Sequence, residues 1–68
     1  MRKTSPIAAN IAQLRRKKGW TQAKLARKTG LSRGHIAAIE QGKKRPTLRT
    51  LAIIAAALGV EIENLRGE

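Results

Sequence analysis

The sequence predicts an all-α fold, a compact five-helix bundle, and three observations lead to this prediction. Aliphatic residues recur three and four positions apart, which places them on one face of a helix. Serine or threonine stands where these patterns begin, and glycine stands where they end, as expected for helix caps. The chain has 68 residues, enough for one domain with a small core. The predicted helices cover residues 6–18, 22–28, 32–41, 48–58 and 60–65.

The first predicted helix begins at Ser5-Pro6. Ser5 suits the N-cap, and proline is well tolerated at the first helical position because its missing N–H would have no partner there. Gly19 ends the helix. Its apolar stripe consists of Ile7, Ile11 and Leu14. We expect a flexible basic arm over residues 1–5 and a single domain over residues 6–66, without a separate oligomerisation domain.

Residues 22–41 have the pattern of two short helices joined by a tight turn. Thr21 can cap the first helix, and Ser32 can cap the second. Gly30 lies between them, where only glycine enters the left-handed conformation without steric cost. Ala26 is small enough to let the two helices cross closely. Because these features fall in one register, the stretch predicts a helix-turn-helix.

The fourth predicted helix begins after Thr47, a suitable N-cap, and ends at Gly59. Its expected core stripe consists of Leu48, Leu51, Ile54, Ala55 and Leu58. The opposite face carries Ile53 and Ala56, which form a small apolar surface. A protein partner would fit such a surface, although single exposed apolar residues are also common.

Charge is the most informative feature of the composition. The chain has 15 Lys and Arg against 4 Asp and Glu, a formal net charge of +11, and the first acid is Glu40. Such a surface favours a polyanionic partner, either nucleic acid or anionic lipid. The alternative is that the charge serves only solubility.

Several function classes are not expected from this composition. With no Cys and 1 His, the chain has neither a disulfide nor a zinc-ligand set. The longest apolar run, residues 51–58, is far shorter than the roughly 20 residues that span a membrane. Few acids, one histidine and no glycine-rich phosphate loop also argue against an enzyme or a bound cofactor. A cytoplasmic protein that contacts no membrane is the expectation.

Five motifs carry a resemblance to a known family. They are Trp20-Thr21-Gln22-x-x-Leu25-Ala26, Gly30-Leu31-Ser32-Arg33, Ile36-x-x-Ile39-Glu40-x-Gly42, Arg45-Pro46-Thr47-Leu48-x-Thr50-Leu51 and Ile54-Ala55-x-Ala57-Leu58-Gly59-Val60. Together they resemble the lambda-repressor-like DNA-binding domain of phage repressors and Cro-type regulators, from Ile7 to Leu65. The resemblance implies a sequence-specific regulator of transcription, expected to be a repressor, that binds double-stranded DNA. Thr29 departs from the family, which usually has an aliphatic residue there, so we expect looser packing at that edge of the turn.

The resemblance also implies which residues contact DNA. Residues 32–41 would be the recognition helix, and the expected base contacts are Ser32, Arg33, Gly34, His35 and Ala38. Arg33 is the sharpest candidate, because a guanidinium can bind guanine O6 and N7 together, although a phosphate contact is the alternative. Gly34 and Ala38 depart from the polar residues usual in the family. The expected phosphate contacts are Thr21, Gln22, Lys43, Lys44 and Arg45, with those of the loop made partly through main-chain N–H groups.

Other residues are expected to have structural roles. The family pairs an arginine of the first helix with a glutamate of the third, and Arg15 and Glu40 match these positions. Trp20 could stack on a base, but the family places a core residue there. Val60 and Leu65 are expected to join the core. The resemblance implies a two-fold dimer, for which Ile62 and Leu65 are the expected contacts.

The sequence thus predicts a homodimer on a near-palindromic operator, with half-sites about 34 Å apart. Two alternatives remain. One is an antitoxin-type regulator whose main partner is a second protein, bound through the Ile53 and Ala56 face. The other is a binder of nucleic acid or anionic surfaces that uses charge without sequence preference.

Overall fold

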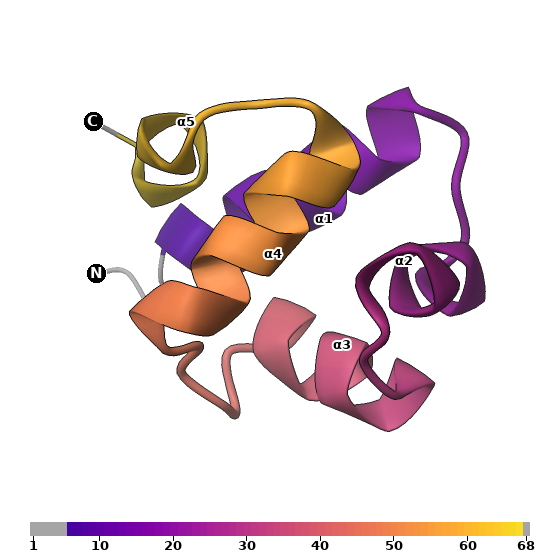
Figure 1. Ribbon diagram of the computed structural model, residues 1–68. Coiled ribbons are helices and arrows are strands. Elements are labelled where there is room, and N and C mark those ends of the chain that lie inside the picture. The colour runs from indigo at the N-terminus through magenta and orange to yellow at the C-terminus, as the bar shows by residue number, and fades with distance from the viewer. Residues whose placement is uncertain (1–5, 68) are drawn as a thin grey trace.

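The computed structural model describes residues 6–67, which form five α-helices (Figure 1). These are α1 (Pro6–Lys17), α2 (Gln22–Thr29), α3 (Arg33–Glu40), α4 (Leu48–Leu58) and α5 (Ile62–Arg66). The predicted all-α bundle is therefore confirmed, and the predicted boundaries lie within one or two residues of those observed. The basic arm predicted for residues 1–5 lies outside the described residues.

The helices pack around a central crossing of α1 and α4, with α4 in front of α1 in Figure 1. Helices α2 and α3 pack against each other on one side of this crossing, and α5 packs against α1 and α4 on the opposite side. The Asn10 side-chain amide donates a hydrogen bond of 2.9 Å to the Leu65 carbonyl and ties α1 to α5. The α2–α3 side and the α5 side of the domain therefore lie on opposite sides of the α1–α4 crossing.

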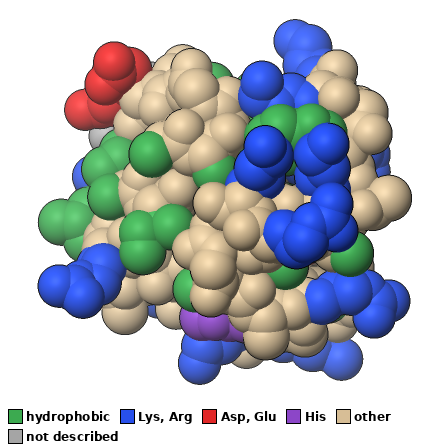
Figure 2. Space-filling model, turned by 45° about the vertical axis from the view of Figure 1, so that its right-hand side comes forward, with side chains coloured by type: hydrophobic (Ala, Val, Ile, Leu, Met, Phe, Trp, Pro, Cys, Tyr) green, Lys and Arg blue, Asp and Glu red, His purple; other side chains and the backbone are tan. Residues whose placement is uncertain are grey.

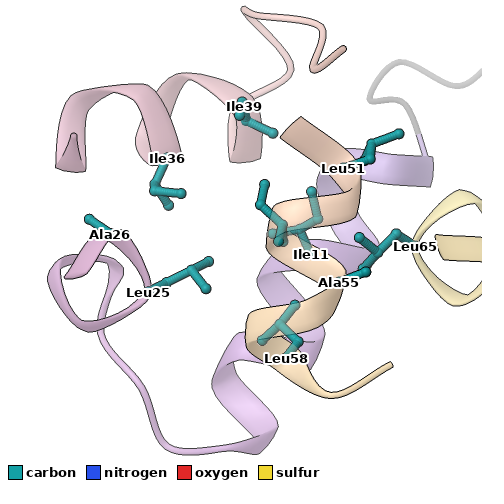
Figure 3. Close-up of a cluster of buried hydrophobic side chains, with 10 residues drawn as sticks. Ile11, Leu25, Ala26, Ile36, Ile39, Leu51, Ala55, Leu58 and Leu65 are labelled. Carbon is teal, nitrogen blue, oxygen red and sulfur yellow. The ribbon is translucent and has the colours of Figure 1, made fainter. Parts of the chain in front are cut away.

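One hydrophobic core holds all five helices together. The fully buried large side chains come from every helix and are Ile11, Leu25, Ile36, Ile39, Ile54 and Leu65. Figure 3 shows that side chains of α2 and α3 point toward those of α4. Burial of each large aliphatic side chain stabilises the fold by about 1.5–3 kcal/mol, so this cluster is the main source of stability in so short a chain.

Side-chain caps set the helix starts predicted from the sequence. The Thr21 hydroxyl accepts a hydrogen bond of 3.0 Å from the Lys24 N–H, and the Ser32 hydroxyl accepts one of 3.0 Å from the His35 N–H. Gly30 ends α2 in the left-handed conformation, with φ of 78°. The helix-turn-helix geometry therefore follows from local sequence signals.

Two residues lie in environments that differ from at least part of the prediction. Leu48 was expected in the core, but its side chain is 65% exposed. It is the first residue of α4, and the buried part of this helix begins one turn later, at Leu51. Leu65 was expected both in the core and in a dimer contact. It is fully buried in the monomer core, which confirms the first expectation and leaves it no surface for a partner.

Thr29 stabilises the turn through hydrogen bonds, whereas the sequence predicted looser packing there. Its hydroxyl lies 2.9 Å from the Leu25 carbonyl and 3.1 Å from the Ala26 carbonyl, and it accepts a 3.3 Å hydrogen bond from the Leu31 N–H. An aliphatic residue would make none of these bonds. The hydroxyl therefore bridges the last turn of α2 and the residue that enters the connection to α3.

Candidate nucleic-acid interface

The start of α2 presents backbone and side-chain donors. The first N–H groups of a helix have no intrahelical acceptor, and the helix dipole makes this end attractive to anions. Thr21 is exposed and caps the helix, while Gln22 is half-buried as its first residue. Both residues predicted to contact phosphate therefore lie at a helix N-terminus.

A buried ionic network holds Gln22 in place. The Arg15 Nε donates to Glu40 Oε2 at 2.7 Å, and its Nη2 donates to Oε1 at 3.0 Å. The Arg15 Nη1 donates to the Trp20 carbonyl at 2.7 Å, and the Gln22 amide donates to Glu40 Oε1 at 3.0 Å. The network thus connects α1, the α1–α2 loop, the start of α2 and the end of α3.

The predicted Arg15–Glu40 pair is therefore present and buried, with side chains 9% and 4% exposed. The hydrogen bonds that Arg15 donates to Glu40 raise the pKa of Arg15 above its usual value, against the opposing effect of burial. Sequence reasoning did not find the bond from Gln22, because Gln22 and Glu40 lie 18 positions apart and no local pattern joins them.

The start of α3 is exposed and carries the predicted base contacts. Arg33 and Gly34 are exposed, and His35 and Ala38 are half-buried on the same helix. Ser32 uses a hydroxyl lone pair to cap the helix, which leaves its O–H free to donate. No neighbouring atom lies within 4 Å of the position that a Cβ on Gly34 would occupy. This end of α3 can therefore approach a partner closely.

The loop between α3 and α4 presents exposed basic side chains, and two of its main-chain N–H groups are already engaged. The N–H groups of Lys43 and Lys44 both donate to the Ala38 carbonyl, at 2.9 and 3.2 Å. Both N–H groups are therefore engaged within the chain, and the expected main-chain contacts of this loop with phosphate stay a prediction. The side chains of Lys43, Lys44 and Arg45 are all exposed and remain available.

A second group of basic side chains surrounds Trp20. The ring is half-buried and packs against the core, as predicted. The ammonium groups of Lys18, Lys24 and Lys28 lie 5.1, 5.8 and 5.7 Å from its centroid. We call these four residues the lysine–tryptophan cluster. The sequence analysis missed it, although lysines four apart on one helix were a usable signal.

Charge is distributed unevenly over the described surface. Most basic side chains in Figure 2 lie toward one side, and the visible acidic ones lie at the opposite upper corner. Of the acids in residues 6–67, Glu40 is held in the buried network, while Glu61 and Glu63 are exposed around α5. The α2–α3 side therefore presents positive charge that suits a polyanion.

The described residues offer no other chemistry of comparable strength. Within residues 6–67, no group of three His, Cys, Asp or Glu side chains is placed to hold a metal ion. No helix in this range is long and apolar enough to span a bilayer. What remains is a helix-turn-helix whose second helix exposes its N-terminal end, with exposed basic side chains on α2 and in the loop after α3. This combination is typical of a DNA-binding domain.

Comparison with known proteins identifies the family. The helix-turn-helix family model matches residues 11–65, and the chain belongs to this family. It is 42% identical over 54 residues to an uncharacterised HTH-type transcriptional regulator of Sinorhizobium fredii, which covers 79% of the chain and 70% of the relative. It is 37% identical over 62 residues to the immunity repressor protein of Bacillus phage phi105, which covers 91% of the chain and 43% of that repressor.

Solved structures agree with this assignment. The restriction-modification controller protein C.AhdI from Aeromonas hydrophila superposes with a TM-score of 0.85 at 30% identity, over 88% of this chain and 91% of that one. The biofilm regulator SinR, solved in complex with DNA, superposes with a TM-score of 0.82 at 30% identity, over 87% and 95% of the two chains. The protein is therefore a DNA-binding transcriptional regulator of the lambda-repressor-like class and not an enzyme.

Proposed function

We propose that the protein is a repressor that binds a near-palindromic operator as a homodimer. One observation carries this proposal: the exposed N-terminal end of α3 follows one group of phosphate-binding candidates in the chain, the start of α2, and precedes another, the loop after α3. With α3 in the major groove, both groups would face the backbone on either side of it. The relative named as a phage immunity repressor supports repression over activation. Such a protein would act in the cytoplasm.

Base recognition is assigned to the first turns of α3. Arg33 is exposed, and within residues 6–67 it makes no ion pair with a carboxylate, so it is free to bind guanine in a bidentate pair. Ser32 and His35 would donate to nearby bases or phosphates. Gly34 would allow close approach of the helix backbone, and Ala38 would contact a thymine methyl group.

Phosphate binding is assigned to the two flanking groups. At the start of α2, the side-chain amide of Gln22 donates one N–H to Glu40. Its second N–H would then donate to a phosphate beside Thr21. In the loop, the side chains of Lys43, Lys44 and Arg45 would each neutralise a phosphate. These contacts set the register of the protein on DNA but carry no sequence information themselves.

Dimerisation is assigned to the α5 end, with Ile62 as its apolar contact. Two copies with a net charge of +11 repel each other, so their interface should avoid the basic surfaces. Glu61 and Glu63 are exposed on either side of half-buried Ile62, which lowers the local positive charge. Figure 1 places α5 on the opposite side from α2, so this contact would leave both recognition helices accessible.

The test is selection of bound duplexes from a random DNA pool by the wild type and by Arg33→Ala. We expect a wild-type consensus of two inverted half-sites about one helical turn apart, with relaxed preference at one base pair per half-site in the variant. That position should lose about 1–3 kcal/mol of discrimination. A pool enriched without any motif would contradict the proposal.

A further inference from the structure

The lysine–tryptophan cluster brings three positive charges together on one aromatic ring. Lys18 directly follows α1, Lys24 lies in the first turn of α2, and Lys28 lies in its last turn. One part of the Trp20 side chain packs against the core, and its ring is the shared neighbour of all three ammonium groups. Each ammonium group is attracted to the face of the ring, and this attraction partly offsets the repulsion among the three lysines.

No carboxylate neutralises this cluster within residues 6–67. The salt bridge between described residues joins Arg15 to Glu40, and Glu40 already accepts three hydrogen bonds, two from Arg15 and one from Gln22. The exposed acids, Glu61 and Glu63, belong to the α5 end on the other side of the domain. The cluster is therefore a site of uncompensated positive charge, and an anion bound there would relieve the repulsion.

The position of the cluster favours the DNA backbone as that anion. Trp20 directly precedes Thr21, and the Lys24 N–H donates to the Thr21 hydroxyl at 3.0 Å. The cluster is therefore continuous with the phosphate-binding candidates at the start of α2. A DNA strand held at Thr21 and Gln22 has only to continue along the same side of the protein to meet it.

The arrangement of the helices also indicates which part of a bound DNA duplex would lie beside the cluster. In the proposed dimer the two-fold axis lies at α5, and α2 lies on the opposite side of each subunit. The cluster therefore points away from the axis, past the outer end of each half-site. We propose that the lysine–tryptophan cluster binds backbone phosphates of the DNA that flanks the operator. This inference rests on the proposed function, because it needs the dimer and its half-sites.

The first experiment compares operator duplexes that carry about 2 or about 10 base pairs outside each half-site. Wild-type protein should bind the longer duplex several-fold more tightly. Lys18→Gln/Lys28→Gln should lose most of this gain and keep the selected consensus. On the longer duplex its plot of log affinity against log salt should be shallower by roughly 2 per subunit, since each phosphate contact contributes about 0.9.

Matched single variants separate the cluster from net charge. Lys28→Gln and Arg49→Gln each remove one exposed positive charge from a helix, but Arg49 lies at the start of α4, outside the cluster. Only Lys28→Gln should reduce the gain from longer flanks. Circular dichroism melting would verify that both variants are folded. Equal losses in the two variants would overturn the proposal.

A second measurement needs no mutation, because Trp20 is the only tryptophan in the chain. Iodide is an anionic quencher that the lysines should attract to the ring, so fluorescence quenching at constant ionic strength should be efficient in the free protein. The longer duplex should protect Trp20 from iodide, and the shorter duplex should not. Equal protection by both would overturn the proposal.

The outcomes distinguish this inference from the function on which it rests. A consensus with inverted half-sites but no gain from longer flanks would overturn the flanking contact alone and direct attention to an acidic protein as the partner of the cluster. A pool without any consensus would overturn the proposed operator, and the flanking contact with it.

Discussion

Two regions of this domain use arginine differently: one arginine is buried in an ionic network, and another is exposed at the start of α3. In the buried network, Arg15 donates hydrogen bonds to Glu40 and to the Trp20 carbonyl and is shielded from solvent. At the start of α3, Arg33 is exposed and has no carboxylate beside it within residues 6–67. In a chain this basic, the placement of a single acid separates the arginine that holds the fold from those that stay exposed and are proposed to contact DNA.

The largest expected effect is on stability and comes from removing the acid of the buried ionic network. Glu40→Ala should lower the free energy of unfolding by about 3–5 kcal/mol, because it leaves Arg15 charged and buried without a partner. It should also release Gln22, so any folded fraction should bind DNA more weakly. Urea denaturation followed by circular dichroism measures the change.

The control for this variant is Glu63→Ala, which removes the same charge from an exposed position on α5. Its stability should change by no more than about 0.5 kcal/mol. Similar losses in the two variants would mean that net charge, and not the buried network, explains the effect of Glu40.

A smaller effect is expected on the exposed side, in the loop after α3. Lys43→Gln/Lys44→Gln should weaken binding about equally on operator and unrelated DNA, because phosphate contacts carry no sequence information. The slope of log affinity against log salt should become shallower by roughly 2 per subunit. Fluorescence anisotropy over a salt series measures both quantities. A changed base preference would show instead that the loop contacts bases.

The smallest expected effect separates folding from binding within α3 itself. Gly34→Ala should raise stability by up to about 1 kcal/mol, because a Cβ there meets no atom within 4 Å and glycine disfavours a helix. Operator affinity should nevertheless fall, because the added methyl group would hold the helix backbone away from the DNA. Thermal melting and operator binding measure the two effects.

Gly30→Ala is the matched control, because its φ of 78° disfavours any residue with a Cβ. It should lower stability, whereas Gly34→Ala should raise it. Unchanged operator affinity in Gly34→Ala would remove Gly34 from the contact surface and leave Arg33 as the main candidate in that turn.

The features predicted correctly from the sequence are those encoded by neighbouring residues. The caps at Thr21 and Ser32 and the left-handed Gly30 each depend on contacts within a few positions. The Arg15–Glu40 pair spans 25 positions and was found only because the chain resembles a family that has it. The direct contacts with DNA and the dimer remain predictions.

The errors concern burial, which depends on elements far away in the chain. Leu48 and Leu65 both continue apolar helical patterns, yet one is exposed and the other fully buried. Periodicity defines a face of a helix but not how far along that face the neighbouring helices extend. The acceptor of the Lys43 and Lys44 main-chain N–H groups likewise depends on tertiary closure, because the loop folds back onto the Ala38 carbonyl.

By itself, the sequence determined the helices, their ends, the helix-turn-helix and the strong positive charge, because propensity, capping and composition act locally. Only the tertiary structure decided which cations are neutralised and which remain free. It placed the one acid of the first forty residues against Arg15 and Gln22, and it gathered three lysines around Trp20. Electrostatic interactions depend on distance and burial, and both are set when separate helices pack together.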